Sequence, residues 1–123
     1  MKLGKLIEKA IRLRGQQFDT DIMTDWINEI EGQAVEMVIG RAKGYDAEFV
    51  PYVYELDAET ELRIPDRFQD VYLNYIFSKI DFNNQETERY NNDVAMFTSA
   101  WEEYGSWFIR NHEQKPLPCF KNL

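Results

Sequence analysis

The residue types that most often perform covalent chemistry are scarce in this chain. Cys119 is the only cysteine and His112 the only histidine, and they lie seven residues apart with two prolines between them. A nucleophilic thiolate needs a base held at a fixed distance, and such a segment predicts no rigid element that would hold one. A metal site built from cysteine and histidine alone needs more members than one chain offers. The sequence therefore predicts no catalytic residue and no zinc site.

Carboxylates are abundant, and three of them are regularly spaced. Asp21, Asp25 and Glu29, here called the acidic row, repeat every four residues, which places them along one face of a helix. The chain has no Asp-x-Asp-x-Asp-Gly loop, no Glu-x-x-His pair and no glycine-rich phosphate loop. We therefore expect no bound metal and no cofactor. The simplest interpretation of the acidic row is a helix face turned towards solvent.

Helical spacing of apolar residues dominates the segments that must position these side chains. It predicts helices near residues 3–14, 21–39, 66–82 and 86–110. In the last of these, aromatic residues follow alternating steps of four and three, as in the contact line of an antiparallel helix pair. The third is apolar on two sides, which is typical of a helix packed centrally, or packed on its own domain and on a neighbouring subunit. We expect a mainly α, four-helix bundle-like fold whose core contains Trp26, Ile30, Tyr72, Ile76, Phe97 and Trp101.

Two segments depart from the helical pattern. Residues 45–64 contain FVPYVYEL, which is aromatic and β-branched, and LDAETELRI, which alternates apolar and polar residues. These runs predict a β-hairpin or an extended arm, and Pro51 confines the first run to an edge or irregular strand. Residues 112–123 contain two prolines one residue apart, which forbid a helix and predict an extended C-terminal tail. Apolar side chains on the arm and tail are candidates for contact with another subunit or protein: Phe49, Tyr52, Tyr54, Leu117 and Phe120.

Length and hydropathy narrow the class of protein. A chain of 123 residues with 44% hydrophobic residues suits a single domain, residues 1–123, with one core. No run approaches the ~20 apolar residues of a membrane-spanning helix. The start, MKLGKLIEKAIRLRG, is interrupted by charges instead of forming a continuous apolar signal segment. We therefore expect a protein of a cytosol, with no membrane partner.

The net charge of −8 is unevenly distributed. Residues 1–15 hold five basic side chains against Glu8, which gives this segment a charge of +4 and leaves −12 on the rest. The acidic body disfavours general binding to nucleic-acid phosphates. A basic start on an acidic body suggests head-to-tail or partner contacts, although an ordinary solvated helix has the same pattern. The basic side chains are Lys2, Lys5, Lys9, Arg12 and Arg14.

The predicted helices and the arm follow an order and spacing that resemble those of a known protein family over most of the chain. An opening helix of the LGKLIEKAIRLRG kind is followed by a second helix, DIMTDWINEIEGQAVEMV, with its Trp-Ile-Asn-Glu step. After the arm, an apolar-proline-acidic step introduces the helix IPDRFQDVYLNYIFSKI, and a polar gap precedes the long helix ETERYNNDVAMFTSAWEEYGSWFI. In these features the chain resembles the head-to-tail connector proteins of tailed bacteriophages, also called adaptor or neck proteins.

The resemblance implies a non-enzymatic four-helix subunit with a protruding arm and tail. Many copies would form a ring below the portal, extend the channel through which DNA enters and leaves, and help to retain the packaged DNA. The implied partners are other copies of the chain, the portal protein, and a tail or stopper protein. DNA would pass through without specific binding. The implied location is the virion neck, and the cytoplasm of the bacterial host during assembly.

A ring of this kind gives the acidic row a second interpretation. A channel that passes DNA must not hold it, and carboxylates that face the channel repel phosphates. Asp21, Asp25 and Glu29 are therefore the candidate channel-facing residues.

A protein of another class has the same composition. A small helical regulatory or protein-interaction domain, of the antirepressor or antitoxin type, could use an acidic surface to imitate nucleic acid. Subunit number separates the two interpretations. A regulator should be a monomer or a dimer, whereas a connector should form a ring or assemble only on its portal. An enzyme is the weakest interpretation, because no constellation of catalytic residues is present.

Overall fold

The computed structural model describes residues 1–116, which contain five α-helices. Two 3-10 turns, Ile39–Arg41 and Asp66–Phe68, follow the second helix and precede the fourth. Within residues 1–116 there is no β-strand, so the predicted mainly α class is confirmed. The helices are α1 (Leu3–Arg14), α2 (Thr20–Met37), α3 (Tyr54–Asp57), α4 (Asp70–Asn83) and α5 (Thr87–Asn111).

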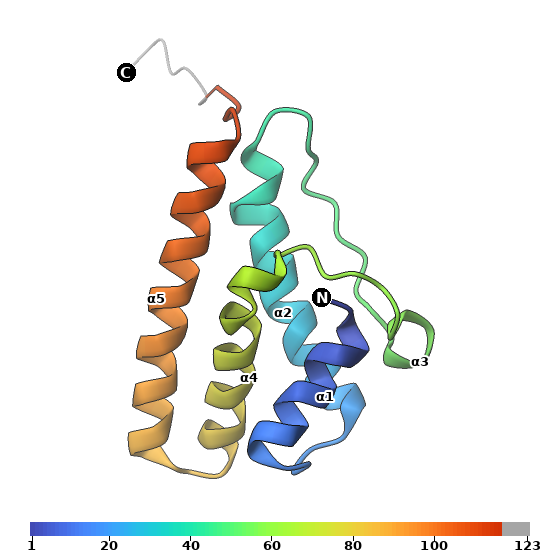
Figure 1. Cartoon of the computed structure of the whole chain (residues 1–123), viewed down its shortest axis with the longest axis vertical. Coiled ribbons are helices and arrows are strands. Elements are labelled where there is room, and N and C mark those ends of the chain that lie inside the picture. The colour runs from blue at the N-terminus through green and yellow to red at the C-terminus, as the bar shows by residue number, and fades with distance from the viewer. Residues whose placement is uncertain (117–123) are drawn as a thin grey trace, which may run out of the picture.

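Helix α4 is the centre of the packing, in agreement with its two apolar sides. It contacts α1, α2 and α5, and Leu73, Ile76 and Ile80 are among its buried side chains. Figure 1 shows α4 and α5 side by side and antiparallel, joined by a short turn, with α1 and α2 on the other side of α4. The core therefore lies mainly between α1, α2 and α4, and α5 is an outer helix.

Six residues were expected in this core, and the structure separates them into two groups. Phe97 and Trp101, both on α5, are only partly buried and pack against the edge of the core. The reason is that α4 is the main helix against which α5 packs, so that one side of α5 is covered and the rest is not. The fully interior members of the predicted set are Trp26, Ile30, Tyr72 and Ile76.

The arm, residues 45–64, contains no β-strand, so of the two predicted alternatives the β-hairpin is wrong; the arm is an irregular, largely extended segment with the single turn of α3. Its second run pairs with the start of the chain instead of with the first run. Leu3 N–H donates to the Thr60 carbonyl over 2.9 Å, and Leu62 N–H donates to the Met1 carbonyl over 2.9 Å. The alternation that predicted a strand reflects the burial of alternate side chains, because Leu62 and Ile64 point inward and are buried. Figure 1 shows the arm running beside α2 and returning to α4.

Two glycines and a lysine fix the ends of the long elements. Gly15 ends α1 with a φ of 76°, a conformation that favours glycine, and its N–H donates to the Ile11 carbonyl. Gly40 follows α2, where an added Cβ would lie 2.7 Å from the Val35 carbonyl oxygen. The start of the tail is tied to the same turn, because the Lys115 ammonium donates to the Gly40 carbonyl over 2.7 Å.

Candidate interaction surface

Helix α5 is long and only lightly buried. Of its 25 residues, just Asp93, Tyr104 and Phe108 are buried. Apolar side chains remain in solvent along it, with Met96 53% and Ile109 57% exposed. A helix in water normally buries a continuous apolar stripe against its own domain. The uncovered sides of α5 are therefore the first candidate for contact with another protein.

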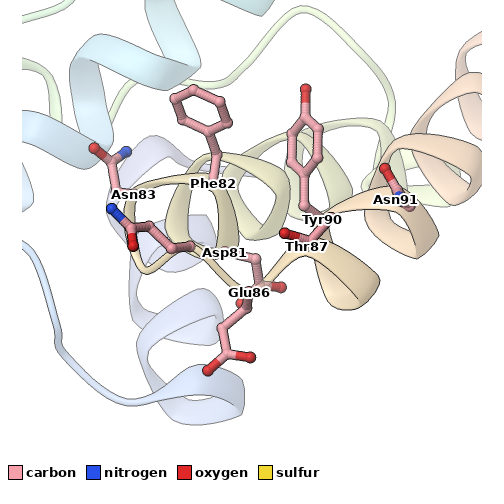
Figure 2. A pocket seen from close by; sticks show the side chains of 8 residues that line it. Asp81, Phe82, Asn83, Glu86, Thr87, Tyr90 and Asn91 are labelled. Carbon is pink, nitrogen blue, oxygen red and sulfur yellow. The ribbon is translucent and has the colours of Figure 1, made fainter.

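Beside this helix, a shallow groove with aromatic walls follows the line between α4 and α5. Two aromatic pairs bridge the helices, Phe82 with Tyr90 and Tyr75 with Phe97, with ring centroids 5.5 Å and 5.4 Å apart. Two cavities, of about 550 Å³ and 240 Å³, share Phe82 and Tyr90 as lining residues. We call them together the α4–α5 groove. Figure 2 shows the rings of Phe82 and Tyr90 projecting to the same side of the turn, while the Glu86 carboxylate points away from them.

The acidic row lies on the exposed side of α2, but its three members differ in their surroundings. Asp21, Asp25 and Glu29 are all exposed. Glu29 is turned towards α4, where its carboxylate lies 3.6 Å from the Lys79 ammonium and accepts a 3.4 Å hydrogen bond from the Tyr75 hydroxyl. Burial, with the charge and hydrogen bond of Glu29, raises the pKa of Tyr75 to about 12. Exposure agrees with both a solvated face and a channel wall, so the channel-facing role stays a prediction.

The predicted interface residues of the arm face their own domain in part. Phe49, Tyr52 and Tyr54 are half-buried and pack against the core. The Asn28 side chain replaces a strand partner here, since it accepts from Tyr52 N–H over 2.8 Å and donates to the Tyr52 carbonyl over 3.0 Å. The outward apolar side chains of the arm are instead Val50, Val53 and Leu56. Leu117 and Phe120 of the tail lie outside the described residues.

A buried carboxylate explains why the arm is fixed. Glu31 of α2 is 0% exposed. It accepts hydrogen bonds from the Tyr52 hydroxyl over 2.8 Å, from Arg63 N–H over 2.9 Å and from the Tyr72 hydroxyl over 2.5 Å. Burial and the Glu31 charge raise the pKa of Tyr72 well above its ordinary value. Because a buried charge is costly unless it is hydrogen-bonded, these three donors join α2, the arm and α4 into one unit.

Four of the five basic side chains near the start of the chain have polar partners within the chain. Lys9 donates to the Gln69 side chain over 2.6 Å, and three of the other cations form ion pairs. Two of these pairs, those of Lys2 and Arg12, are exposed on the surface, whereas Arg14 is partly buried with its two acids. Each pair combines one cation with a carboxylate, so the net charge of −8 is unchanged. The ion pairs are Lys2 with Glu59, Arg12 with Glu8, and Arg14 with both Asp81 and Asp93.

Sequence reasoning missed the three buried acids, although each gave a signal. Glu31 lies four residues after Ile27 on the buried side of α2. Asp81 and Asp93 also occupy buried positions on their helices. An acidic residue at apolar helical spacing is a recognisable exception, because carboxylates are almost never buried unless paired. The spacing marks such a residue as partnered but does not identify the partner.

The described residues contain no group of three or more His, Cys, Asp or Glu side chains arranged to hold a metal ion. None of the helices in this part of the chain is long and apolar enough to cross a membrane. His112 stacks on Phe108, with ring centroids 3.8 Å apart, and its Nδ1 lies 2.9 Å from the Phe108 carbonyl oxygen. Cys119 lies outside the described residues. Comparison of the chain with protein-family models, with curated proteins and with solved structures finds no match.

Proposed function

We propose that this chain is a subunit of the head-to-tail connector of a tailed bacteriophage. Several copies form a ring below the portal, and the ring extends the DNA channel and helps to retain the packaged genome. The order and spacing of the helical segments, which resemble those of connector proteins, support this proposal. The chain acts by assembly instead of catalysis, and its partners are other copies, the portal protein and a tail or stopper protein.

The observation that carries the proposal is the one-sided packing of α5. Only three of the 25 residues of α5 are buried, so its own domain covers the remaining apolar and aromatic side chains of this helix only in part. The half-buried rings of Tyr90, Phe97 and Trp101 and the 38% exposed Val94 lie along it, and several of them line the α4–α5 groove. Apolar and aromatic side chains of this kind are typical of the centre of a protein interface. In a ring, a neighbouring subunit or the portal covers this side.

Charge supports the same proposal. A channel lined by carboxylates repels DNA phosphates, whereas a lysine-rich lining would hold them and slow transit. The exposed acidic row supplies up to three carboxylates per subunit, of which Glu29 is partly neutralised by Lys79. At physiological salt the repulsion extends only ~8 Å from the surface, so it acts on DNA that is already inside the channel.

Retention of DNA by viral heads tests the proposal. Purified protein is added to DNA-filled heads of its phage that carry the portal but lack a tail, and released DNA is measured. We expect the protein to bind the heads and to reduce leakage. Val94→Glu should abolish binding, because it places a charge among the apolar side chains that line the α4–α5 groove, and the 38% exposure of Val94 lets the fold accept the change. The matched control is Leu13→Glu, which changes another exposed helical residue on α1.

Absence of binding to portal-bearing heads by the folded wild-type protein would contradict the connector proposal. Loss of binding with both variants would instead show that the chosen groove is not the specific contact. Replacement of Asp21, Asp25 and Glu29 by lysine tests the channel wall separately. In particles that assemble correctly, we expect slower DNA ejection. An unchanged ejection rate would show that the acidic row is ordinary surface charge and not part of a channel wall.

One observation favours the alternative function, a small acidic regulatory or interaction domain. The net charge of −8 leaves an excess of carboxylates on the chain, which suits a basic protein partner. Native mass spectrometry separates the two functions, first with the chain alone and then with portal-bearing heads. A stable monomer or dimer that does not bind the portal would support the regulatory function.

A further inference from the structure

Three charged side chains from three helices meet in the interior. Arg14, in the last turn of α1, places Nη1 2.9 Å from Asp81 Oδ2 and Nη2 3.3 Å from Asp93 Oδ1. Asp81 on α4 is 2% exposed and Asp93 on α5 is 3% exposed. The Phe77 ring lies 4.2 Å from the Arg14 guanidinium and covers it. The two buried carboxylates therefore share a single cation, the Arg14 guanidinium, which leaves one negative charge in the cluster without a counterion.

The unbalanced charge has a specific location. Asp93 Oδ2 is buried and has no hydrogen-bond partner within the described residues. The Asp81 and Asp93 side chains are themselves within hydrogen-bonding reach of each other. A proton held between the two carboxyl groups supplies the missing donor and removes the excess charge. Such sharing is the usual solution when two carboxylates occupy one buried site.

The surrounding charges favour protonation of Asp93 and ionisation of Asp81. Burial, then the hydrogen bond and charge of Asp81, raise the pKa of Asp93 to about 6, although Arg14 opposes the change. Burial by itself would also raise the pKa of Asp81, but hydrogen bonds from Asp93 and Arg14 and the charge of Arg89 lower it overall. The charged groups that face the pair are thus Arg14 from α1 and Arg89 from α5.

This cluster anchors a part of α5 that has little else to hold it. Between residues 87 and 100, Asp93 is the only buried side chain. The half-buried aromatic pairs with α4 provide the remaining contacts of this half. The second half of α5 is different, because Tyr104 and Phe108 are buried there. Attachment of the first half therefore depends strongly on whether the buried carboxylates are balanced.

We propose that Arg14, Asp81 and Asp93 form a proton-dependent clasp for the first half of α5. With one proton shared between the carboxyl groups, residues 87–100 are fixed against α4 and the end of α1. With both carboxyl groups ionised, their repulsion opens this segment ahead of the anchored Tyr104, and the aromatic walls of the α4–α5 groove become accessible. The proposal does not depend on the connector function.

Hydrogen exchange of the full chain, corrected for the intrinsic effect of pH, measures the opening. Between pH 5.0 and pH 7.5 we expect protection of residues 87–100 to fall about tenfold, with little change around residues 104–108. Asp93→Asn supplies a permanent donor at the same position and should keep this segment protected at both pH values. Equal protection of the wild type at both pH values, or an undiminished pH effect in the variant, would overturn the proposal.

A second measurement needs no variant. The Asp93 carboxyl carbon, followed by NMR in the wild-type protein, should titrate near pH 6 together with amide signals of residues 87–100. A midpoint near the ordinary value of an aspartate, or a titration that leaves those amide signals unchanged, contradicts the clasp.

Discussion

Replacement of Glu31 by glutamine tests the account of the buried core most directly. The side chain keeps its shape, so no cavity forms, but one carboxylate oxygen becomes an amide nitrogen that donates. If the nitrogen replaces Oε1, the hydroxyl of Tyr72 loses its acceptor; if it replaces Oε2, Tyr52 and Arg63 N–H both lose theirs. The first orientation costs less, and one unsatisfied buried donor is worth about 1–3 kcal/mol.

Loss of the carboxylate charge works in the opposite direction, because a neutral amide is less costly to bury. We therefore expect Glu31→Gln to lower the free energy of unfolding by about 1–3 kcal/mol, a considerable part of the ~5–15 kcal/mol of a small domain. Urea unfolding gives this value from the shift in midpoint at constant slope. Glu36→Gln, an exposed change on the same helix, is the matched control and should stay within about 0.5 kcal/mol of the wild type. Equal effects of the two substitutions would refute the reasoning.

Three further predictions concern stability. Gly40→Ala should destabilise, because the new methyl group meets backbone on two sides, whereas Gly105→Ala has open space and should stabilise α5 by about 0.5–1 kcal/mol in thermal unfolding. Ile76→Ala should cost ~2–5 kcal/mol in urea unfolding, and Trp101→Ala should cost less than a fully buried tryptophan would, because its ring is half-exposed. As pH rises from about 5 to 7.5, the raised pKa of Asp93 should lower the stability of the wild type by about 1.4 kcal/mol, since the folded state must release a proton that the unfolded state has already lost. Asp93→Asn should flatten this dependence, and an identical slope in both proteins would exclude it.

The helices were predictable because local patterns determine them. Apolar spacing located α1, α2 and α5 to within two residues, and Gly15 ends α1 as expected. The predicted start of α4 is four residues too early, because Asp66–Phe68 forms a separate 3-10 turn. The arm was predicted less well, since its backbone partners are distant in sequence. Asn28 bonds Tyr52, and Met1 bonds Leu62, and neither contact leaves a periodic signal. A pattern of alternating residues predicts an extended chain with one buried side, but it does not identify what the chain lies against.

The candidate site shows the same limit. The spacing of the aromatic residues predicted which side of α5 packs against the domain. It did not predict how completely other helices cover that side, so Phe97 and Trp101 were expected to be more buried than they are. The acidic row was identified as a helix face, and the contact of Glu29 with Lys79 came only with the packing of α2 against α4. The cluster of Arg14 with its two acids joins positions 67 and 79 residues apart, beyond the reach of any local pattern.

The contact of Lys115 with the turn after α2 bears on the order in which the chain folds. The helical hairpin of α4 and α5 is made from neighbouring segments and closes a short turn, so it forms at low entropic cost. The Lys115 ammonium reaches Gly40 across 75 residues, so we expect this contact to form after the hairpin. Contacts that form late affect unfolding more than folding. Lys115→Ala should therefore speed unfolding in stopped-flow experiments while leaving the refolding rate nearly unchanged.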